Sequence, residues 1–204
     1  MERGPLLLLL SLLLVTSACG AGGGYEARNG DVIFHTSRSS QSLAIQRATA
    51  SPYSHMGIVY VEDGDAYVYE AVGPVKTTPL EEWIARGEGG RFVVKRLRNA
   101  DEVLTPEALR RMREAGEAFR GRPYDLYFEW SDDRIYCSEL VWKIYQRALG
   151  LEIGNVETIA DFDLTDPAVQ AKIRERWTDG PPPDETVISP AAMFESDRLV
   201  TVFP

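Results

Sequence analysis

Residues 136–150 read YCSELVWKIYQRALG and contain the strongest helical pattern in the chain. Apolar side chains follow Cys137 at intervals of three and four residues, at Leu140, Val141, Ile144, Tyr145 and Ala148. This spacing places them on one face of an α-helix. Gly150 is typical of the residue that ends a helix. The pattern therefore predicts a helix over residues 138–149, with Cys137 at its head.

The position of Cys137 has two interpretations. A helix N-terminus carries roughly half a positive charge, which lowers the pKa of a thiol placed there. Because the thiolate is the nucleophilic form, Cys137 is a candidate catalytic residue. The alternative is a buried cysteine that serves only as a small apolar side chain. Position alone leaves both interpretations open.

A cysteine nucleophile needs a base, and the chain has two histidines. His55 lies where a loop enters a β-rich run, and active residues are often found at such strand ends. His35 follows a short strand among polar residues, and we expect it on a surface loop. His55 is therefore the candidate base.

Two β-rich runs, residues 56–61 and 66–71, flank the dipeptide Asp63-Gly64. Asp-Gly between two such runs predicts a β-hairpin with a two-residue turn. Facing residues in that hairpin have numbers that add up to 127. The register follows from the turn length, so a longer turn would change the pairing.

This register makes Glu70 the diagonal cross-strand neighbour of His55, because residue 57 faces residue 70. Glu70 also interrupts an apolar run, where a carboxylate is costly unless it is paired. We therefore expect Glu70 to orient the His55 ring. The alternative is an exposed glutamate at a strand end, since a slip of one residue would move Glu70 to the opposite face.

The remaining patterns predict an α+β domain with a small antiparallel sheet packed with helices. There is no internal repeat and no linker to a second domain. Strands are expected over residues 30–34 and 92–97, a final segment over 199–203, and helices over 40–50, 78–83, 105–120 and 166–177.

The N-terminus has the pattern of an export signal. An apolar run over residues 6–15 is followed by the small residues 16–18 and then by Cys19. The run is shorter than the about 20 residues that a membrane-spanning helix needs. A small residue before a cysteine resembles a bacterial lipobox, which would make Cys19 the lipidated first residue. Ordinary secretion is the alternative.

The resulting organisation has three parts. Residues 1–18 are the lipoprotein-type signal peptide, residues 19–28 contain the lipidation site and a Gly-rich tether, and residues 29–204 form one domain. Lipidation of Cys19 would leave Cys137 without a disulfide partner, and an unpaired cysteine in an exported protein indicates a reactive thiol. By resemblance to bacterial sorting signals, Gly20 indicates the outer membrane, facing the periplasm, if the host has one.

Composition excludes several classes of function. The sum of 22 Lys and Arg against 31 Asp and Glu gives a net charge of −9, which argues against nucleic acid as a partner. Two cysteines cannot build a four-cysteine zinc site. Glu129, Asp132 and Asp133 indicate an acidic turn, because no further ligand completes a metal site. We expect no cofactor, and the sequence does not indicate an oligomeric state.

Six motifs occur in one order along the chain: DVIF (31–34), SRSSQS (37–42), YSHMGIV (53–59), YEAVGPV (69–75), WSDDR (130–134) and YCSELVW (136–142). Together they resemble the YiiX-like family of permuted papain-fold cysteine hydrolases in the NlpC superfamily. The resemblance extends over about residues 29–203, nearly the whole chain after the tether.

The resemblance implies a permuted papain-like fold and a catalytic triad of Cys137, His55 and Glu70. It implies acyl transfer through a thioacyl intermediate on Cys137, with the Cys137 N–H as one oxyanion donor. Tyr53 is a candidate second donor or a packing aromatic.

The resemblance leaves the substrate open. Members of the superfamily cleave peptidoglycan peptides, whereas the permuted branch also resembles lecithin:retinol acyltransferase-like enzymes that act on lipids. An apolar pocket would favour a lipid or acyl substrate, and a polar groove would favour a peptide. A non-catalytic envelope binding protein with the same fold is the rival from another class.

Overall fold

The structure of the chain is a computed structural model that describes residues 24–204. The predicted export signal, Cys19 and most of the Gly-rich tether lie outside the described residues. Within the described part, no helix combines the length and apolar character needed to cross a membrane.

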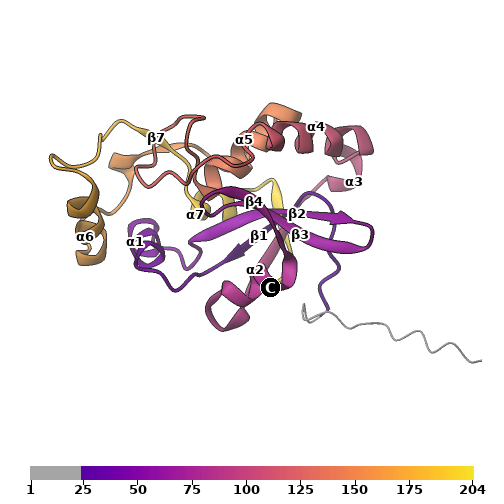
Figure 1. The fold of residues 1–204 in the computed structure, drawn as a ribbon, viewed down its shortest axis with the longest axis horizontal. Coiled ribbons are helices and arrows are strands. Elements are labelled where there is room, and N and C mark those ends of the chain that lie inside the picture. The colour runs from indigo at the N-terminus through magenta and orange to yellow at the C-terminus, as the bar shows by residue number, and fades with distance from the viewer. Residues whose placement is uncertain (1–23) are drawn as a thin grey trace, which may run out of the picture.

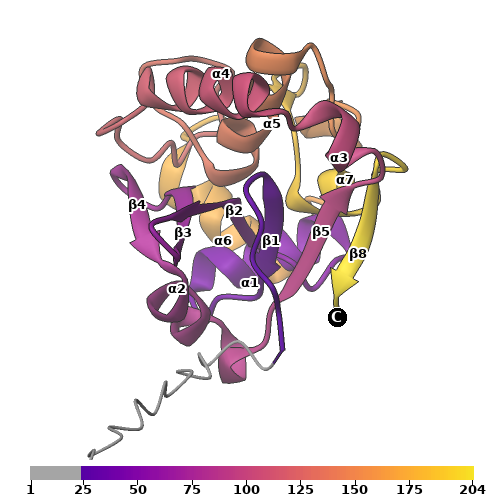
Figure 2. The ribbon, with the colours of Figure 1, turned by 90° about the vertical axis from the view of Figure 1, so that its right-hand side faces the viewer.

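A six-stranded antiparallel sheet lies at the centre of the domain (Figure 2). Its strand order is β4-β3-β2-β1-β5-β8. The strands are β1 (Asp31–His35), β2 (His55–Glu62), β3 (Asp65–Ala71), β4 (Val75–Pro79), β5 (Val93–Leu97) and β8 (Leu199–Phe203). A second, two-stranded sheet pairs β6 (Glu157–Thr158) with β7 (Thr186–Val187). The α+β class predicted from the sequence is confirmed.

Helices cover both faces of the large sheet. They are α1 (Ser40–Thr49), α2 (Leu80–Arg86), α3 (Ala100–Val103), α4 (Pro106–Glu117), α5 (Cys137–Leu149), α6 (Pro167–Arg176) and α7 (Pro190–Phe194), with short 3-10 turns at Glu88–Gly90 and Ile159–Asp161. Figure 2 shows α4 and α5 on one side of the sheet and α2 on the other. At one end of the molecule α1 packs against α6 (Figure 1).

Alternation along the strands divides the core in two. Val32 and Phe34 point toward α5, whereas Ile33 between them points toward α2 and Trp83. Successive side chains of a strand lie on opposite faces, so a sheet covered on both sides needs an apolar residue at nearly every position. All five residues of β1 are buried accordingly.

The predicted hairpin between β2 and β3 is confirmed. Ile58 faces Tyr69 and Glu62 faces Asp65, which is the register of a two-residue turn. Asp63 and Gly64 both have positive φ angles, of 51° and 93°, as the favoured hairpin turn requires.

One strand of the large sheet, and both short strands of the small sheet, have no counterpart in the sequence prediction. Gly73-Pro74 does not end the sheet; the chain turns and returns as β4, which pairs with β3. Only Val75 and Thr78 of β4 are buried, so this edge strand lacks the alternation that marks a strand. The helix predicted over residues 78–83 begins later, at Leu80, because Thr78 and Pro79 belong to the strand.

Gly57 lets β3 approach β2 closely near the candidate site. A Cβ atom at residue 57 would lie 2.4 Å from Val68 Cγ1 and 2.8 Å from the Tyr69 carbonyl oxygen. Gly57→Ala is therefore expected to lower the free energy of unfolding by about 1–3 kcal/mol, because β3 must move away. Urea denaturation measures this change. A midpoint equal to that of the wild type would contradict the close approach.

Candidate active site

Cys137 is the first residue of α5, and its side chain is buried as a free thiol. The helix begins one residue earlier than predicted, which places the sulfur in the first turn. The first N–H groups of a helix have no partner within it. The backbone N–H of Cys137 is thus available to an oxygen atom next to the sulfur.

His55 is the first residue of β2 and is buried. Its Nε2 atom lies 2.6 Å from Glu70 Oε2, so the contact predicted from the hairpin register is present. Burial acts to lower the pKa of His55, but hydrogen bonds with Cys137 and Glu70 outweigh it and raise the pKa to about 9. Because Nε2 meets the carboxylate, Nδ1 is the ring nitrogen left for the thiol.

Glu70 is fully buried and has three polar partners. The Thr78 hydroxyl donates to Oε1 at 2.6 Å, and the Arg86 guanidinium donates to the same oxygen. Burial acts to raise the pKa of Glu70, but its bonds with His55 and Thr78 and the charge of Arg86 lower it to about 2. Glu70 is therefore ionised and its carboxylate is fixed in orientation.

Thr78 and Arg86 were not predicted as site residues. Thr78 lies in β4, the strand that the sequence pattern did not reveal, and Arg86 lies in the last turn of α2. A buried carboxylate needs more than one polar partner. The position of Glu70 in an apolar strand therefore indicates that further partners exist, but the sequence does not show which residues they are.

The expectation for His35 was wrong. The residue ends β1, is buried, and lies opposite His55 in the β1–β2 pairing. Its ring stacks on Trp83, with 4.0 Å between the ring centroids. Burial and the neighbouring His55 lower the pKa of His35 to about 3, so His35 stays neutral. The strand continues one residue further than predicted, which carries His35 from the loop into the core.

A tyrosine lies beside the thiol, but it is not Tyr53. The Tyr53 ring stacks on Phe194 with a centroid separation of 4.1 Å. Tyr124 instead lies beside Cys137 in the site, and burial together with the interaction with Cys137 raises the pKa of Tyr124 well above its usual value. Tyr124 is therefore a neutral donor next to the sulfur. It follows the α4 helix in a loop with no helical or strand pattern, so the sequence offered no signal for it.

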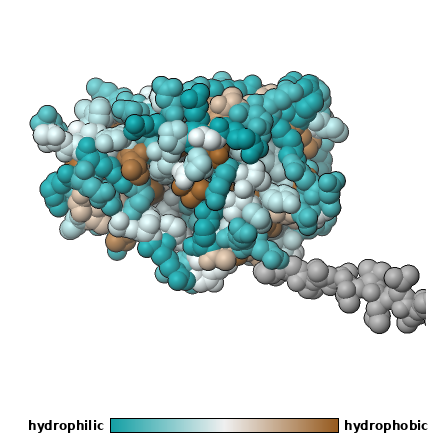
Figure 3. All heavy atoms as spheres, viewed as in Figure 1, coloured by the Kyte–Doolittle hydropathy of each residue, from teal (hydrophilic) through white to brown (hydrophobic). Residues whose placement is uncertain are grey.

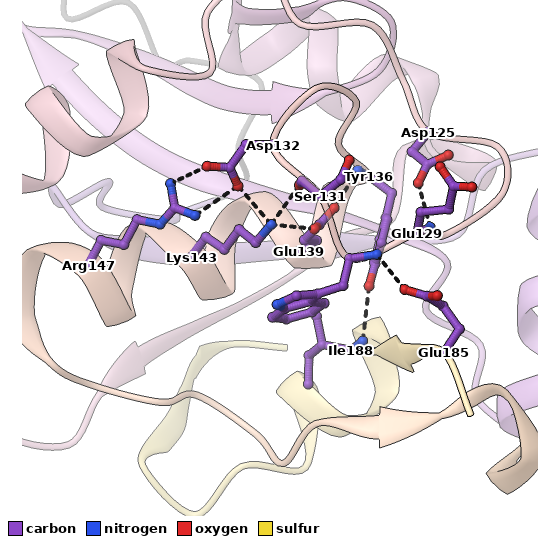
Figure 4. A network of polar contacts seen from close by, with 11 residues as sticks. Asp125, Glu129, Ser131, Asp132, Tyr136, Glu139, Lys143, Arg147, Glu185 and Ile188 are labelled. Atoms are coloured by element: carbon purple, nitrogen blue, oxygen red, sulfur yellow. Dashed lines mark hydrogen bonds and ion pairs between the residues drawn. The ribbon is translucent and has the colours of Figure 1, made fainter. Parts of the chain in front are cut away.

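A network of charged side chains holds the start of α5 and the loop before it (Figure 4). Lys143 lies 2.6 Å from Glu139 and 2.9 Å from Asp132, and it donates to the Ser131 carbonyl oxygen. Arg147 pairs with Asp132 from the next turn of the helix. These contacts fix the segment that precedes Cys137.

Asp132 is thus held by two cations, Lys143 and Arg147. Across residues 24–204, no group of three or more His, Cys, Asp or Glu side chains is placed so that it could hold a metal ion.

An apolar pocket opens beside Cys137. Its walls come from α1, α6, the 159–164 segment and the 187–190 segment. On the face drawn in Figure 3, apolar side chains lie in hollows between hydrophilic ones. The apolar residues of the wall are Ala44, Ile45, Ala48, Phe128, Ile159, Phe162, Leu164, Val169, Ile173, Trp177, Pro181, Val187, Ile188 and Pro190.

Comparisons with known proteins show what the chain is similar to. Residues 26–203 match the family described as "Permuted papain-like amidase enzyme, YaeF/YiiX, C92 family". The protein named "Uncharacterized protein YiiX" of Escherichia coli (strain K12) is 47% identical over 196 residues, which are 96% of this chain and 94% of that protein.

A solved structure is also similar. It is described as the crystal structure of metalloprotein yiiX from Escherichia coli O157:H7. It is 48% identical to this chain, with a TM-score of 0.83, and the match covers 88% of this chain and all of that one.

Proposed function

This chain belongs to the permuted papain-like amidase family, and we propose that it is a cysteine hydrolase that cleaves an amide or related acyl bond through Cys137. The observation that carries the proposal is the arrangement of Cys137, His55 and Glu70. A thiol at a helix N-terminus lies beside an imidazole that a buried carboxylate orients. This is the relation of nucleophile, base and orienting group that acyl transfer requires.

The proposed first half-reaction forms a thioester. His55 holds the proton of the Cys137 thiol, and the thiolate attacks the substrate carbonyl carbon to form a carbon–sulfur bond. The Cys137 N–H and the Tyr124 hydroxyl donate to the oxyanion that develops. His55 then donates its proton to the leaving amine as the carbon–nitrogen bond breaks.

The proposed second half-reaction returns the enzyme to its starting state. His55 takes a proton from water, and the hydroxide attacks the thioester carbonyl. The carbon–sulfur bond breaks, a carboxylic acid leaves and the Cys137 thiolate regains its imidazolium partner. An acceptor other than water would turn the same steps into an acyl transfer.

The pocket favours a substrate with an apolar acyl chain over a peptide. Its walls are aliphatic and aromatic over nearly their whole extent, and Cys137 is among the lining residues. Burial of an acyl chain contributes about 0.8 kcal/mol for each CH₂ group. A lipid or other acyl compound whose carbonyl lies at the sulfur therefore fits this site.

Intact-mass spectrometry tests the proposal. The purified protein is mixed with a series of N-acyl p-nitroanilides and p-nitrophenyl esters whose acyl chains have increasing length. We expect a hydroxylamine-sensitive acyl adduct on Cys137 and turnover that rises with chain length. Peptide anilides serve as the comparison, and preferential turnover of these would favour a peptide substrate. A protein that forms no adduct with any compound would favour the non-catalytic binding protein.

The proposed location is the bacterial cell envelope, with a lipid anchor on Cys19. Residues 6–18, the small residues before Cys19 and the glycines after it support this proposal. An anchored hydrolase would meet acyl-containing envelope molecules, peptide or lipid, at the membrane surface.

A further inference from the structure

Arg176 is the last residue of α6 and lines the same apolar pocket as Cys137. Its guanidinium donates to the Leu126 carbonyl oxygen at 2.8 Å and to the side-chain oxygen of Gln41 on α1. The head of the side chain is thus held in place by two oxygen atoms. Neither acceptor carries a negative charge.

Arg176 has no direct ion-pair partner within the described residues, and the negative charges of Glu175 and Asp125 act on it only from beyond ion-pairing distance. No carboxylate of residues 24–204 forms an ion pair with it, and its Nε atom is buried without a hydrogen-bond partner. The other cation that lines the pocket, Lys172, pairs with Glu175 at 2.6 Å. A partly buried cation in apolar surroundings is costly unless an anion or further hydrogen bonds compensate it.

Arg176 and the proposed reaction centre lie along the same pocket. The Arg176 guanidinium holds the carbonyl oxygen of Leu126, two residues after Tyr124, and Tyr124 lies beside Cys137. The positive charge of Arg176 acts to lower the pKa of Tyr124, against the larger effect of burial. An anion at Arg176 would therefore lie in the same pocket as the scissile bond, with the apolar walls beside it.

We propose that Arg176 determines specificity by binding an anionic group, a carboxylate or a phosphate, on an acyl substrate. The inference rests on the proposed function, because it places the acyl chain in the pocket and its carbonyl at Cys137. The anion belongs to the part of the substrate that leaves, or to a headgroup a few atoms from the carbonyl. A carboxylate on an N-acyl amino acid meets this description, and so does the phosphate of a phospholipid.

Calorimetric binding to the Cys137→Ala variant tests the proposal without turnover. The matched probes are N-dodecanoylglycine, which is anionic, and N-dodecanoylglycine amide, which is neutral and has the same chain. We expect the anionic probe to bind at least about tenfold more tightly, as a hydrogen bond to a charged group permits. Dodecyl phosphate is the third probe, and its affinity relative to N-dodecanoylglycine shows which anion the site prefers.

Adding Arg176→Gln to that variant should remove the preference for the anionic probes and leave the neutral probe within about twofold. Arg174→Gln is the matched control, because Arg174 lies exposed on the same helix turn. Gln41→Ala removes one of the bonds that hold α6 to α1 and keeps the cation. It should therefore preserve the preference that Arg176→Gln removes.

Two outcomes would overturn the proposal. One is equal binding of the anionic and neutral probes when Arg176 is present, which needs no folded Arg176 variant. The other is an equal loss of affinity for all three probes in Arg176→Gln and in Gln41→Ala, which would mean that Arg176 only holds α6 against α1. Anion-selective binding without hydrolysis of any probe by the wild type would instead support Arg176 and contradict the proposed function.

Discussion

Cys137→Ala is expected to abolish hydrolysis of any acyl substrate and to leave the fold intact. The thioester cannot form without the sulfur, so kcat/KM should fall by at least about 10³-fold. The side chain is small and buried, and its loss should change the free energy of unfolding by only about 1 kcal/mol. Steady-state kinetics and thermal unfolding, measured on the same preparation, separate the two effects.

Cys137→Ser is the matched control for this variant. It places a hydroxyl at the position of the thiol, and a hydroxyl is a weaker nucleophile. Cys137→Ser should therefore be nearly as inactive as Cys137→Ala and about as stable as the wild type. Retained activity in Cys137→Ala would contradict the mechanism. Loss of folding in both variants would mean that Cys137 is needed for the core alone.

His55→Ala is expected to lower kcat/KM by at least about 10³-fold, because the same imidazole receives the thiol proton and protonates the leaving amine. The pH profile of the wild type should carry the signature of this group. The contacts of His55 raise its pKa to about 9 in the folded protein, so the proton donor is present below that pH and is lost above it.

Turnover should therefore decline as the pH rises through about 9. Glu70 has a pKa of about 2, so it stays ionised over the whole pH range of the assay and does not contribute to this decline. Kinetics across pH 6–10 check this expectation. A profile that continues to rise above pH 9 would contradict the role of His55 as proton donor.

The contact between His55 and Glu70 in the hairpin could be predicted from the sequence alone. Asp63-Gly64 specified the turn, the turn specified the register, and the register placed Glu70 diagonally from His55. This succeeded because a two-residue turn leaves little freedom in the pairing. The head of α5 could be predicted for a similar reason, since an apolar stripe specifies the helix that follows Cys137.

The partners of these residues could not be predicted in the same way. Thr78 reaches Glu70 from an edge strand whose residues do not alternate, and Tyr124 reaches Cys137 from an irregular loop. The polar residues that follow His35 indicate a surface loop, although the residue belongs to the preceding strand and is buried. A local pattern does not show where such a strand ends.

The pocket depends on tertiary structure throughout. Its walls join α1, α6 and two segments near the C-terminus, which no sequence periodicity relates to one another. The sequence does not show whether the substrate pocket is apolar or polar. The fold shows that the walls are mostly apolar, and that Arg176 lies in them without a direct ion-pair partner among the described residues.

The most direct test of the central claim is the rate at which iodoacetamide alkylates Cys137, compared between the wild type and His55→Ala at pH 6.5 and 8.5. A free thiol is deprotonated about fiftyfold more at the higher pH. If His55 holds the thiolate as an ion pair, the wild-type rate should change less than about threefold between these pH values. The rate in His55→Ala should show the full increase. An equally steep increase in both proteins would contradict the proposed cysteine–histidine site.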